Sequence, residues 1–171
     1  MFDYVCIFTT GGVLLWSKAF CATSLNIELI NIFIRSMLLE NTQGGASRKQ
    51  FSYQDNLLKW QINQELKVVF TVVYKEILQL AFVDQFLNML QKAFYEGVYS
   101  KAIVSDPNLN RDDFFMRLIA NQDAMFGEHY RIVYKMWDDQ VKAQRNEPKK
   151  MKTFNETKLG KQVGKKKNKG G

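Results

Sequence analysis

The stretch FSYQDNLLKWQINQELKVVFTVVYKEILQLAFVDQFLNMLQKAF, residues 51 to 94, decides the fold. At its centre an apolar side chain occupies every second position from Leu66 to Tyr74, which is the period of one face of a β-strand. Val69 and Val73 are apolar on the opposite face. We therefore expect this strand to be covered on both sides and to lie in the middle of its sheet.

The residues on either side of this strand predict an antiparallel meander that runs into a helix. Leu58, Trp60 and Ile62 alternate in the same way, and Asn63-Gln64 is a polar break of hairpin length. After Lys75-Glu76, residues 77 to 80 can form one more short strand. The period then becomes helical, with apolar residues at Val83, Phe86, Leu87, Leu90, Phe94 and Val98.

The N-terminal part predicts two further strands and a helix. Residues 2 to 8 and 13 to 16 have strand patterns, and Thr9-Thr10-Gly11-Gly12 predicts the turn between them, because glycine accepts positive φ. Residues 27 to 38 predict a helix with an unusually wide apolar surface, which is either sandwiched in the core or partly reserved for a partner. Its apolar residues are Ile27, Ile30, Ile34 and Leu38, widened by Leu29, Phe33 and Met37.

The C-terminal part predicts a loop, a third helix and a linker. Residues 100 to 110 contain Pro107 and are expected to be a loop, after which Asn110 and Asp113 form a capping pattern. Apolar residues then keep helical spacing to residue 137, interrupted by Gly127. The predicted order is β-β-α-β-β-β-α-α in an α/β (α+β) domain of residues 1–145, followed by a disordered lysine-rich linker of residues 146–171.

Positive charge is concentrated at the C-terminal end of the chain. Residues 1 to 141 hold 13 Lys and Arg against 15 Asp and Glu, whereas residues 142 to 171 hold 11 against 2. The formal charge is thus −2 for the body and +9 for the last thirty residues. Only this tail is a candidate for polyanion binding, through Lys149, Lys150, Lys152, Lys165, Lys166 and Lys167.

The sequence has no pattern typical of an enzyme. His129 is the only histidine, which excludes a multi-histidine metal site and weakens any Ser-His or Cys-His scheme. No phosphate-binding loop, dinucleotide fingerprint or Cys-x-x-Cys pair is present, and Cys6 and Cys21 are expected to be reduced. No run of apolar residues is long enough to span a membrane, and the N-terminus is not expected to be a secretory signal.

Three blocks together resemble one family, namely MFDYVCIFTTGGVLLW, IELINIFIRSMLLE and LKWQINQELKVVFTVVYKEILQLAFVDQFLNMLQKAF. They are similar to the N-terminal domain of the signal recognition particle receptor α subunit (docking protein). The lysine-rich continuation after MKTFNETKLGKQ is similar to the linker of that family. The resemblance covers residues 1 to 160 in order and comes from the series of blocks, since no single block is diagnostic.

The resemblance implies a longin-like (SNARE-like) domain with a five-stranded antiparallel sheet and flanking helices. It also implies a non-catalytic role in co-translational protein targeting, as a domain that binds the receptor β subunit, a Ras-like GTPase of the endoplasmic reticulum membrane. GTP and Mg²⁺ are then expected on the partner, with no cofactor on this chain, and membrane association is indirect and peripheral on the cytosolic face. The family's own GTPase domain lies further toward the C-terminus, so the chain is expected to be a fragment.

Two other functions stay open at this point. One is a different longin-type trafficking adaptor, and the other is a ribosome- or RNA-binding module that acts through the basic tail; DNA is not expected as a partner. For a GTPase partner, we expect contact through the glycine turn and the adjoining face of the first helix. The predicted contact residues are Thr10, Gly11, Gly12, Asn31 and Arg35.

Overall fold

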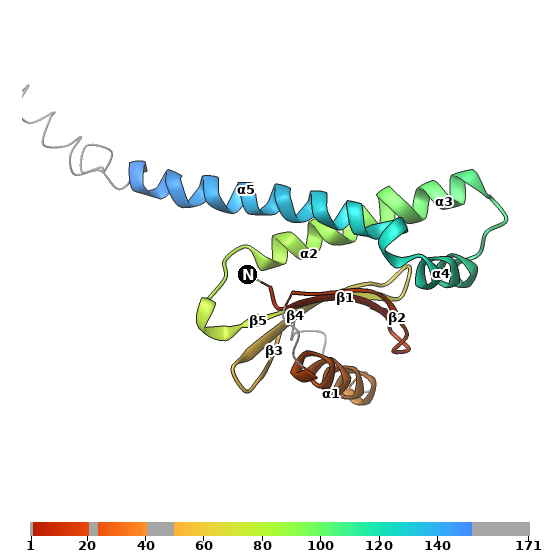
Figure 1. The fold of residues 1–171 in the computed structure, drawn as a ribbon, viewed down its shortest axis with the longest axis horizontal. Helices are drawn as coiled ribbons and strands as arrows, with labels where there is room; N and C mark the ends of the chain where they lie inside the picture. The colour runs from red at the N-terminus through yellow and green to blue at the C-terminus, as the bar shows by residue number, and fades with distance from the viewer. Residues whose placement is uncertain (1, 21–23, 41–49, 152–171) are drawn as a thin grey trace, which may run out of the picture. The chain divides into compact units, whose positions relative to one another are not determined.

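The computed structural model describes residues 2–20, 24–40 and 50–151 (Figure 1). The chain divides into two compact units, residues 1–134 and residues 135–171, and the fold described here is that of the first unit. In the described ranges, no helix is both long enough and apolar enough to cross a membrane.

The first unit is built on one antiparallel sheet of five strands. In spatial order the strands are β2-β1-β5-β4-β3, and each pairs antiparallel with its neighbours. Strand β5 lies in the middle and is buried from Val68 to Tyr74, as its two-sided apolar pattern predicts. The strands are β1 (Tyr4–Thr9), β2 (Leu14–Ala19), β3 (Gln50–Tyr53), β4 (Asn56–Asn63) and β5 (Val68–Lys75).

The helices flank the sheet, which confirms the predicted five-stranded antiparallel sheet with flanking helices. Helix α1 lies on one side of the sheet, and α2 and α4 lie on the other (Figure 1). Two segments, η2 and η3, are π-helical, and η1 is a 3-10 helix. The bounds are α1 (Ser24–Glu40), η1 (Glu76–Leu78), α2 (Val83–Lys92), η2 (Ala93–Tyr99), α3 (Ser100–Ser105), α4 (Arg111–Ala120), η3 (Asp123–Gly127) and α5 (Glu128–Met151).

One side of the sheet, called the open face below, is covered by α1 as the only helix among the described residues. Phe33 of α1 packs between Phe8 of β1 and Trp60 of β4, with ring centroids 6.1 Å and 4.6 Å apart, respectively. A fringe of partly buried apolar side chains surrounds this cluster, because one helix is too narrow to cover five strands. The fringe consists of Ile34, Phe51, Tyr53, Trp60 and Ile62.

The other side, called the closed face, carries an aromatic core. Phe94 of η2 packs against Phe70 of β5, Phe114 of α4 and Phe126 of η3, with ring centroids 5.5, 6.0 and 5.6 Å away. Trp16 of β2 contacts Phe126 as well, at 5.1 Å. All five side chains are fully buried, so several helical segments share one core with the sheet.

The prediction of a strand at residues 77 to 80 was wrong. Residues 77 to 80 form no strand, because β5 ends where its partner strand begins, with Lys75 paired to Asn56, and the chain then turns into η1. The fifth strand is β3, whose Phe51 and Tyr53 alternate toward the open face. The sequence pattern predicts no strand at residues 50 to 53, where Phe51 and Tyr53 are the apolar residues.

The helical region also differs from the sequence-based expectation. Residues 100 to 105, expected in a loop, continue the helical run of α2 and η2 as α3, and the loop begins only at Asp106. The capping pattern is confirmed, because Asn110 Oδ1 accepts a hydrogen bond of 2.8 Å from the Asp113 backbone N–H. The interruption near Gly127 is the π-helical η3.

The C-terminal unit contains most of α5. Within it, Lys142 Nζ lies 2.9 Å from Asp138 Oδ2, an ion pair one helical turn apart. Helix α5 runs to Met151 and so includes the first residues of the predicted linker of residues 146–171. Residues 152 to 171 of the predicted linker lie outside the described residues.

Candidate partner-binding surface

The β1–β2 turn is held in one conformation by four hydrogen bonds. The Thr9 and Gly12 backbone N–H groups donate across the turn, to Val13 O and Thr9 O, both at 2.8 Å. Thr9 Oγ1 accepts from the Val13 N–H at 3.1 Å. The Thr10 N–H donates to Lys67 O at 2.9 Å, which ties this turn to the β4–β5 turn beside it. The tip is therefore a fixed feature rather than a loose loop.

The turn lies directly against α1. Gly12 has a φ of 92°, a left-handed conformation that favours glycine, and a Cβ added there would lie 3.3 Å from Ile34 Cγ2. A side chain at this position would meet both backbone strain and a close neighbour. Glycine thus brings the turn and the helix together, as the predicted surface requires.

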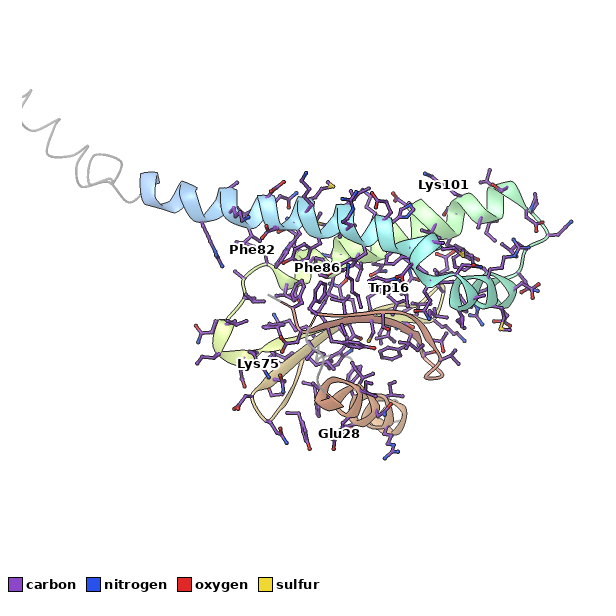
Figure 2. All side chains as sticks on the ribbon, viewed as in Figure 1. Trp16, Glu28, Lys75, Phe82, Phe86 and Lys101 are labelled. Atoms are coloured by element: carbon purple, nitrogen blue, oxygen red, sulfur yellow. The ribbon has the colours of Figure 1, made fainter. Side chains whose placement is uncertain are left out.

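The outward side of α1 presents a stripe of three exposed side chains. Ile27, Asn31 and Arg35 are each one helical turn apart and all exposed, whereas Leu29, Ile30 and Phe33 are buried against the sheet. Figure 2 shows Glu28, the neighbour of Ile27, on the side of α1 that points away from the sheet.

Ile27, one of the residues of the wide apolar surface predicted for this helix, lies outside the core. Its side chain is 62% exposed. The apolar surface of α1 is wide enough to be centred on either of two rows, and packing against Phe8 and Trp60 selects the row that contains Phe33.

The structure places all five predicted contact residues at the turn or on the outward stripe of α1. Asn31 and Arg35 are exposed, and Arg35 has no acidic side chain within ion-pair distance in the described part of the chain. That these residues contact a partner stays a prediction. The predicted set is Thr10, Gly11, Gly12, Asn31 and Arg35.

Two apolar residues of the same surface were missed by the sequence analysis. Val13 and Leu14 are 52% and 40% exposed, next to the turn. Leu14 pairs with Phe8, whose side chain lies under α1, and a bulge at Leu15 separates this pair from the rest of the ladder. The sequence pattern predicted a strand at residues 13 to 16 but not the bulge, which shifts the faces of the strand.

The lysines predicted to bind polyanions lie at the end of the described residues or beyond them. Lys149 and Lys150 fall in the last turns of α5, where side chains are not described. Lys152, Lys165, Lys166 and Lys167 lie outside the described residues. Their role also stays a prediction.

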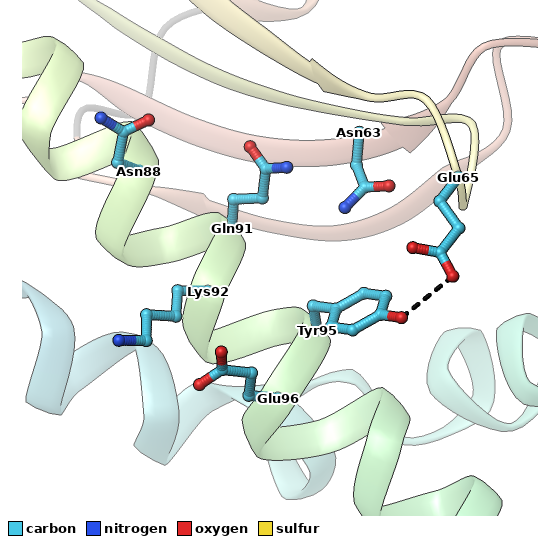
Figure 3. Close-up of a pocket in the computed structure, with 7 residues that line it drawn as sticks. All are labelled: Asn63, Glu65, Asn88, Gln91, Lys92, Tyr95 and Glu96. Atoms are coloured by element: carbon cyan, nitrogen blue, oxygen red, sulfur yellow. Dashed lines mark hydrogen bonds between the residues drawn. The ribbon is translucent and has the colours of Figure 1, made fainter.

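A groove of about 350 Å³ lies between the β4–β5 turn and the helical run of α2 and η2 (Figure 3). Tyr95 Oη donates a hydrogen bond of 3.0 Å to Glu65 Oε1 across it, and this bond raises the pKa of Tyr95. The lining contains no histidine, cysteine or serine, so it offers no nucleophile with a base. It consists of Asn63, Glu65, Asn88, Gln91, Lys92, Tyr95 and Glu96.

The lone histidine has a packing role. The His129 ring lies parallel to that of Phe126, with centroids 6.2 Å apart, and it faces Gly97 so closely that a Cβ there would lie 3.1 Å from His129 Cδ2. Across residues 2–20, 24–40 and 50–151, no three His, Cys, Asp or Glu side chains are grouped as metal ligands.

Residues 28–157 match the family described as "Signal recognition particle, alpha subunit, N-terminal". The chain is 28% identical over 164 residues to the signal recognition particle receptor subunit alpha homolog of Drosophila melanogaster, covering 95% of this chain and 23% of that protein. It is 26% identical to the receptor subunit alpha of Canis lupus familiaris, over 85% of this chain and 23% of that protein. The chain thus spans about a quarter of these relatives.

Two solved structures are also similar to this chain. One is a signal recognition particle receptor SRb-GTP/SRX complex from Chaetomium thermophilum, with a TM-score of 0.40, 25% identity, and coverage of 69% of this chain and 97% of that chain. The other is a mammalian SRP receptor, with a TM-score of 0.37, 22% identity, and coverage of 72% and 96%.

Proposed function

This chain belongs to the family of signal recognition particle alpha-subunit N-terminal domains, and on that basis we propose that it binds the receptor β subunit, a Ras-like GTPase. Through this contact it anchors the receptor at the cytosolic face of the endoplasmic reticulum, as a peripheral component of co-translational protein targeting. Family membership supports the partner, and the surface formed by the β1–β2 turn and α1 supports the place of contact.

One observation carries the proposed interface, which is the close approach of Gly12 to Ile34. It makes the turn and the outward side of α1 a single surface, on which polar and apolar side chains alternate. Val13, Leu14 and Ile27 supply exposed apolar area, and Arg35 supplies an exposed cation. Apolar centres with an arginine nearby are common in protein interfaces.

The rigidity of the turn favours recognition of an ordered switch loop. Ras-like switch loops are ordered by contacts to the γ-phosphate and Mg²⁺, and they are released after hydrolysis. The β1–β2 turn has one conformation, so it forms a stable set of contacts only with a switch loop that is itself ordered. We therefore infer that this domain prefers the GTP-bound β subunit, with GTP and Mg²⁺ held by the partner.

The proposed interface can be tested by titrating the domain with the purified β-subunit GTPase. The Asn31→Asp, Arg35→Glu double variant should weaken binding by about 2 kcal/mol, or roughly thirtyfold, because a desolvated cation is replaced by an anion. The matched control is Asn88→Asp, Lys101→Glu, with the same kinds of change on exposed residues of α2 and α3.

Calorimetric titration with the GTP-bound and GDP-bound partner measures both effects together. The affinity of the control variant should lie within about twofold of that of the unaltered domain, because exposed charges far from an interface contribute little to binding. Equal loss in both double variants would contradict the proposed place of contact. Equal affinity for the two nucleotide states would contradict the switch-loop interpretation.

We further propose that the chain has no catalytic activity of its own. A GTPase needs a backbone cradle for the phosphates and ligands for Mg²⁺, and the sequence contains no phosphate-binding loop. Equilibrium dialysis of the purified chain with labelled GTP should show no stoichiometric complex. A one-to-one complex would overturn this part of the proposal.

A second candidate function rests on the charge of the C-terminal tail. Residues 142–171 carry 11 Lys and Arg against 2 acids, so positive charge is concentrated in this part of the chain. We propose residues 1–145 as the folded domain and residues 146–171 as a linker that binds ribosomal RNA or another polyanion without sequence preference.

The tail is tested in the full chain by changing its six predicted lysines to glutamine. If all six contact single-stranded RNA, the logarithm of the binding constant should fall with the logarithm of salt concentration at a slope of about −4, and the variant should lose this dependence. Unchanged RNA affinity in the variant would leave the tail as a spacer. The affinity of this lysine variant for the β-subunit GTPase should not change.

A further inference from the structure

The segment from Glu76 to Phe82 exposes apolar side chains at the far end of the sheet. It joins β5 to α2, and in Figure 1 it lies at the end of the sheet opposite the β1–β2 turn. Ile77 is 87% exposed, the largest value for a large apolar side chain in the described residues, and Leu78 and Phe82 are 47% and 44% exposed. Three exposed apolar residues within six positions form a local cluster, whereas exposed apolar residues on a protein surface are usually scattered singly.

The backbone holds this segment in an uncommon conformation. Gln79 has φ 43° and ψ 51°, and Phe82 has φ 63° and ψ 23°, so two non-glycine residues within four positions are left-handed. Each such residue costs about 1 kcal/mol or more. Hydrogen bonds maintain the shape: the Glu76 N–H donates to Asp55 O at 2.9 Å and the Gln79 N–H to Glu76 O at 3.1 Å.

The surroundings of this segment are acidic. Asp55, Glu76 and Asp84 are all exposed near it. Asp84 follows Phe82 by two residues in the chain. Burial raises the pKa of Tyr74, and the charges of Asp84 and then Glu76 raise it further. Lys75 is the neighbouring cation, and it already donates to Asn56 Oδ1 at 2.9 Å and lies 3.9 Å from Asp3 Oδ2. Figure 2 shows Lys75 just before the segment and Phe82 at its end, next to α2.

We propose that this segment, with Asp55, Glu76 and Asp84 around it, is a second docking surface for a cationic amphipathic segment of another protein. Apolar side chains of the partner cover Ile77, Leu78 and Phe82, while its lysine or arginine side chains pair with the three carboxylates. The charge complementarity selects a basic peptide over an anionic membrane, whose headgroups the carboxylates repel.

This surface is separate from the proposed GTPase-binding surface. Strands β1 and β5 run antiparallel over their whole paired length, so the β1–β2 turn and η1 lie at opposite ends of the sheet. Both surfaces can therefore be occupied in one complex. Such an arrangement lets the domain hold its membrane-bound partner while it contacts a second protein.

The test uses the full 171-residue chain and a fluorescent 18-residue helical peptide made of leucine and lysine. Fluorescence anisotropy should show that the peptide binds and that this binding weakens as the salt concentration rises. Two double variants should each weaken peptide binding at least tenfold. One is Ile77→Ser, Leu78→Ser, and the other is Asp55→Asn, Glu76→Gln. The matched controls are Val104→Ser, at a residue 80% exposed on α3, and Asp123→Asn, at an exposed carboxylate of η3. Both controls should bind within twofold of the unaltered chain.

Three results would overturn the proposal. The first is equal affinity in the test and control variants, and the second is equal binding of a peptide with glutamate in place of lysine. The third is Ile77-dependent binding to vesicles of neutral phosphatidylcholine with no binding of the peptide, which would assign the surface to lipid. The Ile77→Ser, Leu78→Ser double variant should bind the GTPase as the unaltered chain does. Failure of the proposed peptide-binding surface is therefore distinguishable from failure of the proposed GTPase interface.

Discussion

The two faces of the sheet differ in how completely helices cover their apolar side chains. The closed face is covered by α2, η2 and η3, and its core aromatic side chains are fully buried, namely Trp16, Phe70, Phe94, Phe114 and Phe126. In the part of the chain that the structure describes, α1 is the only helix on the open face, and Phe51, Trp60 and Ile62 at its margin remain partly exposed. Both faces are apolar in sequence, so apolar character alone does not show which face is closed.

The difference indicates where stability and recognition reside. Large apolar side chains contribute most when they are removed completely from water, which happens on the closed face. Side chains left partly exposed contribute less to folding and remain available to a partner. The candidate partner-binding surface accordingly lies along the open face, where the β1–β2 turn meets α1.

Removal of a closed-face aromatic ring should have the largest effect. Phe94→Ala leaves a cavity among Phe70, Phe114 and Phe126, and we expect a loss of about 3 to 5 kcal/mol in the free energy of unfolding. Trp60→Ala, at the margin of the open face, should cost clearly less although the side chain is larger. Urea unfolding followed by circular dichroism measures both, and equal losses would remove the distinction between the faces.

The centre of the open face should nevertheless exclude water. Cys6 is fully buried beneath α1, and burial raises the pKa of its thiol well above the usual range. Because the thiolate is the reactive form, we expect Cys6 to react at least about 100-fold more slowly in the native chain than in urea. Iodoacetamide labelling in a Cys21→Ser background measures this rate.

The same thiol implies a pH dependence. The folded chain keeps the Cys6 proton at a pH where the unfolded chain has lost it, so its contribution to stability is present at neutral pH and is lost as the pH rises above the usual thiol value. Cys6→Ala should reduce this alkaline loss. Fast labelling at neutral pH would mean that α1 leaves the sheet readily.

A change at the β1–β2 turn should have an intermediate effect. Gly12→Ala places a side chain at φ 92° and 3.3 Å from Ile34, and we expect a loss of about 1 to 2 kcal/mol. It should also weaken GTPase binding, since the turn and α1 must move apart. Gly11→Ala is the control, because a Cβ there meets only Thr9 Oγ1 at 3.7 Å. Equal destabilisation by both changes would contradict the role given to Gly12.

The smallest effect on folding is expected at the exposed apolar residues of the candidate partner-binding surface. Val13→Ser and Ile27→Ser should change the free energy of unfolding by no more than about 0.5 kcal/mol, because both side chains are largely exposed in the native state. Binding to the GTPase should nevertheless weaken by roughly tenfold for the pair, as about 1.4 kcal/mol is lost with the apolar contact. Thermal melting and a binding titration measure the two effects separately, and a large loss of stability with intact binding would reverse our interpretation of this surface.

Local sequence patterns predicted much of this fold correctly. The apolar pattern on both faces of Val68 to Tyr74 predicted a central strand, and Asn110 predicted the cap that it forms with Asp113. The paired glycines predicted the turn after β1. Each of these features depends on a few neighbouring residues, whose spacing or backbone preference is sufficient to specify it.

Tertiary structure decided the remaining features. Ile27 belongs to the apolar surface of α1 by spacing, but it lies outside because packing against Phe8 and Trp60 selects the row of Phe33. Residues 77 to 80 have a strand-like composition, but β4 offers them no pairing partner beyond Asn56. Periodicity shows which side chains share a face, whereas the neighbours that cover each face are set by contacts between residues distant in sequence.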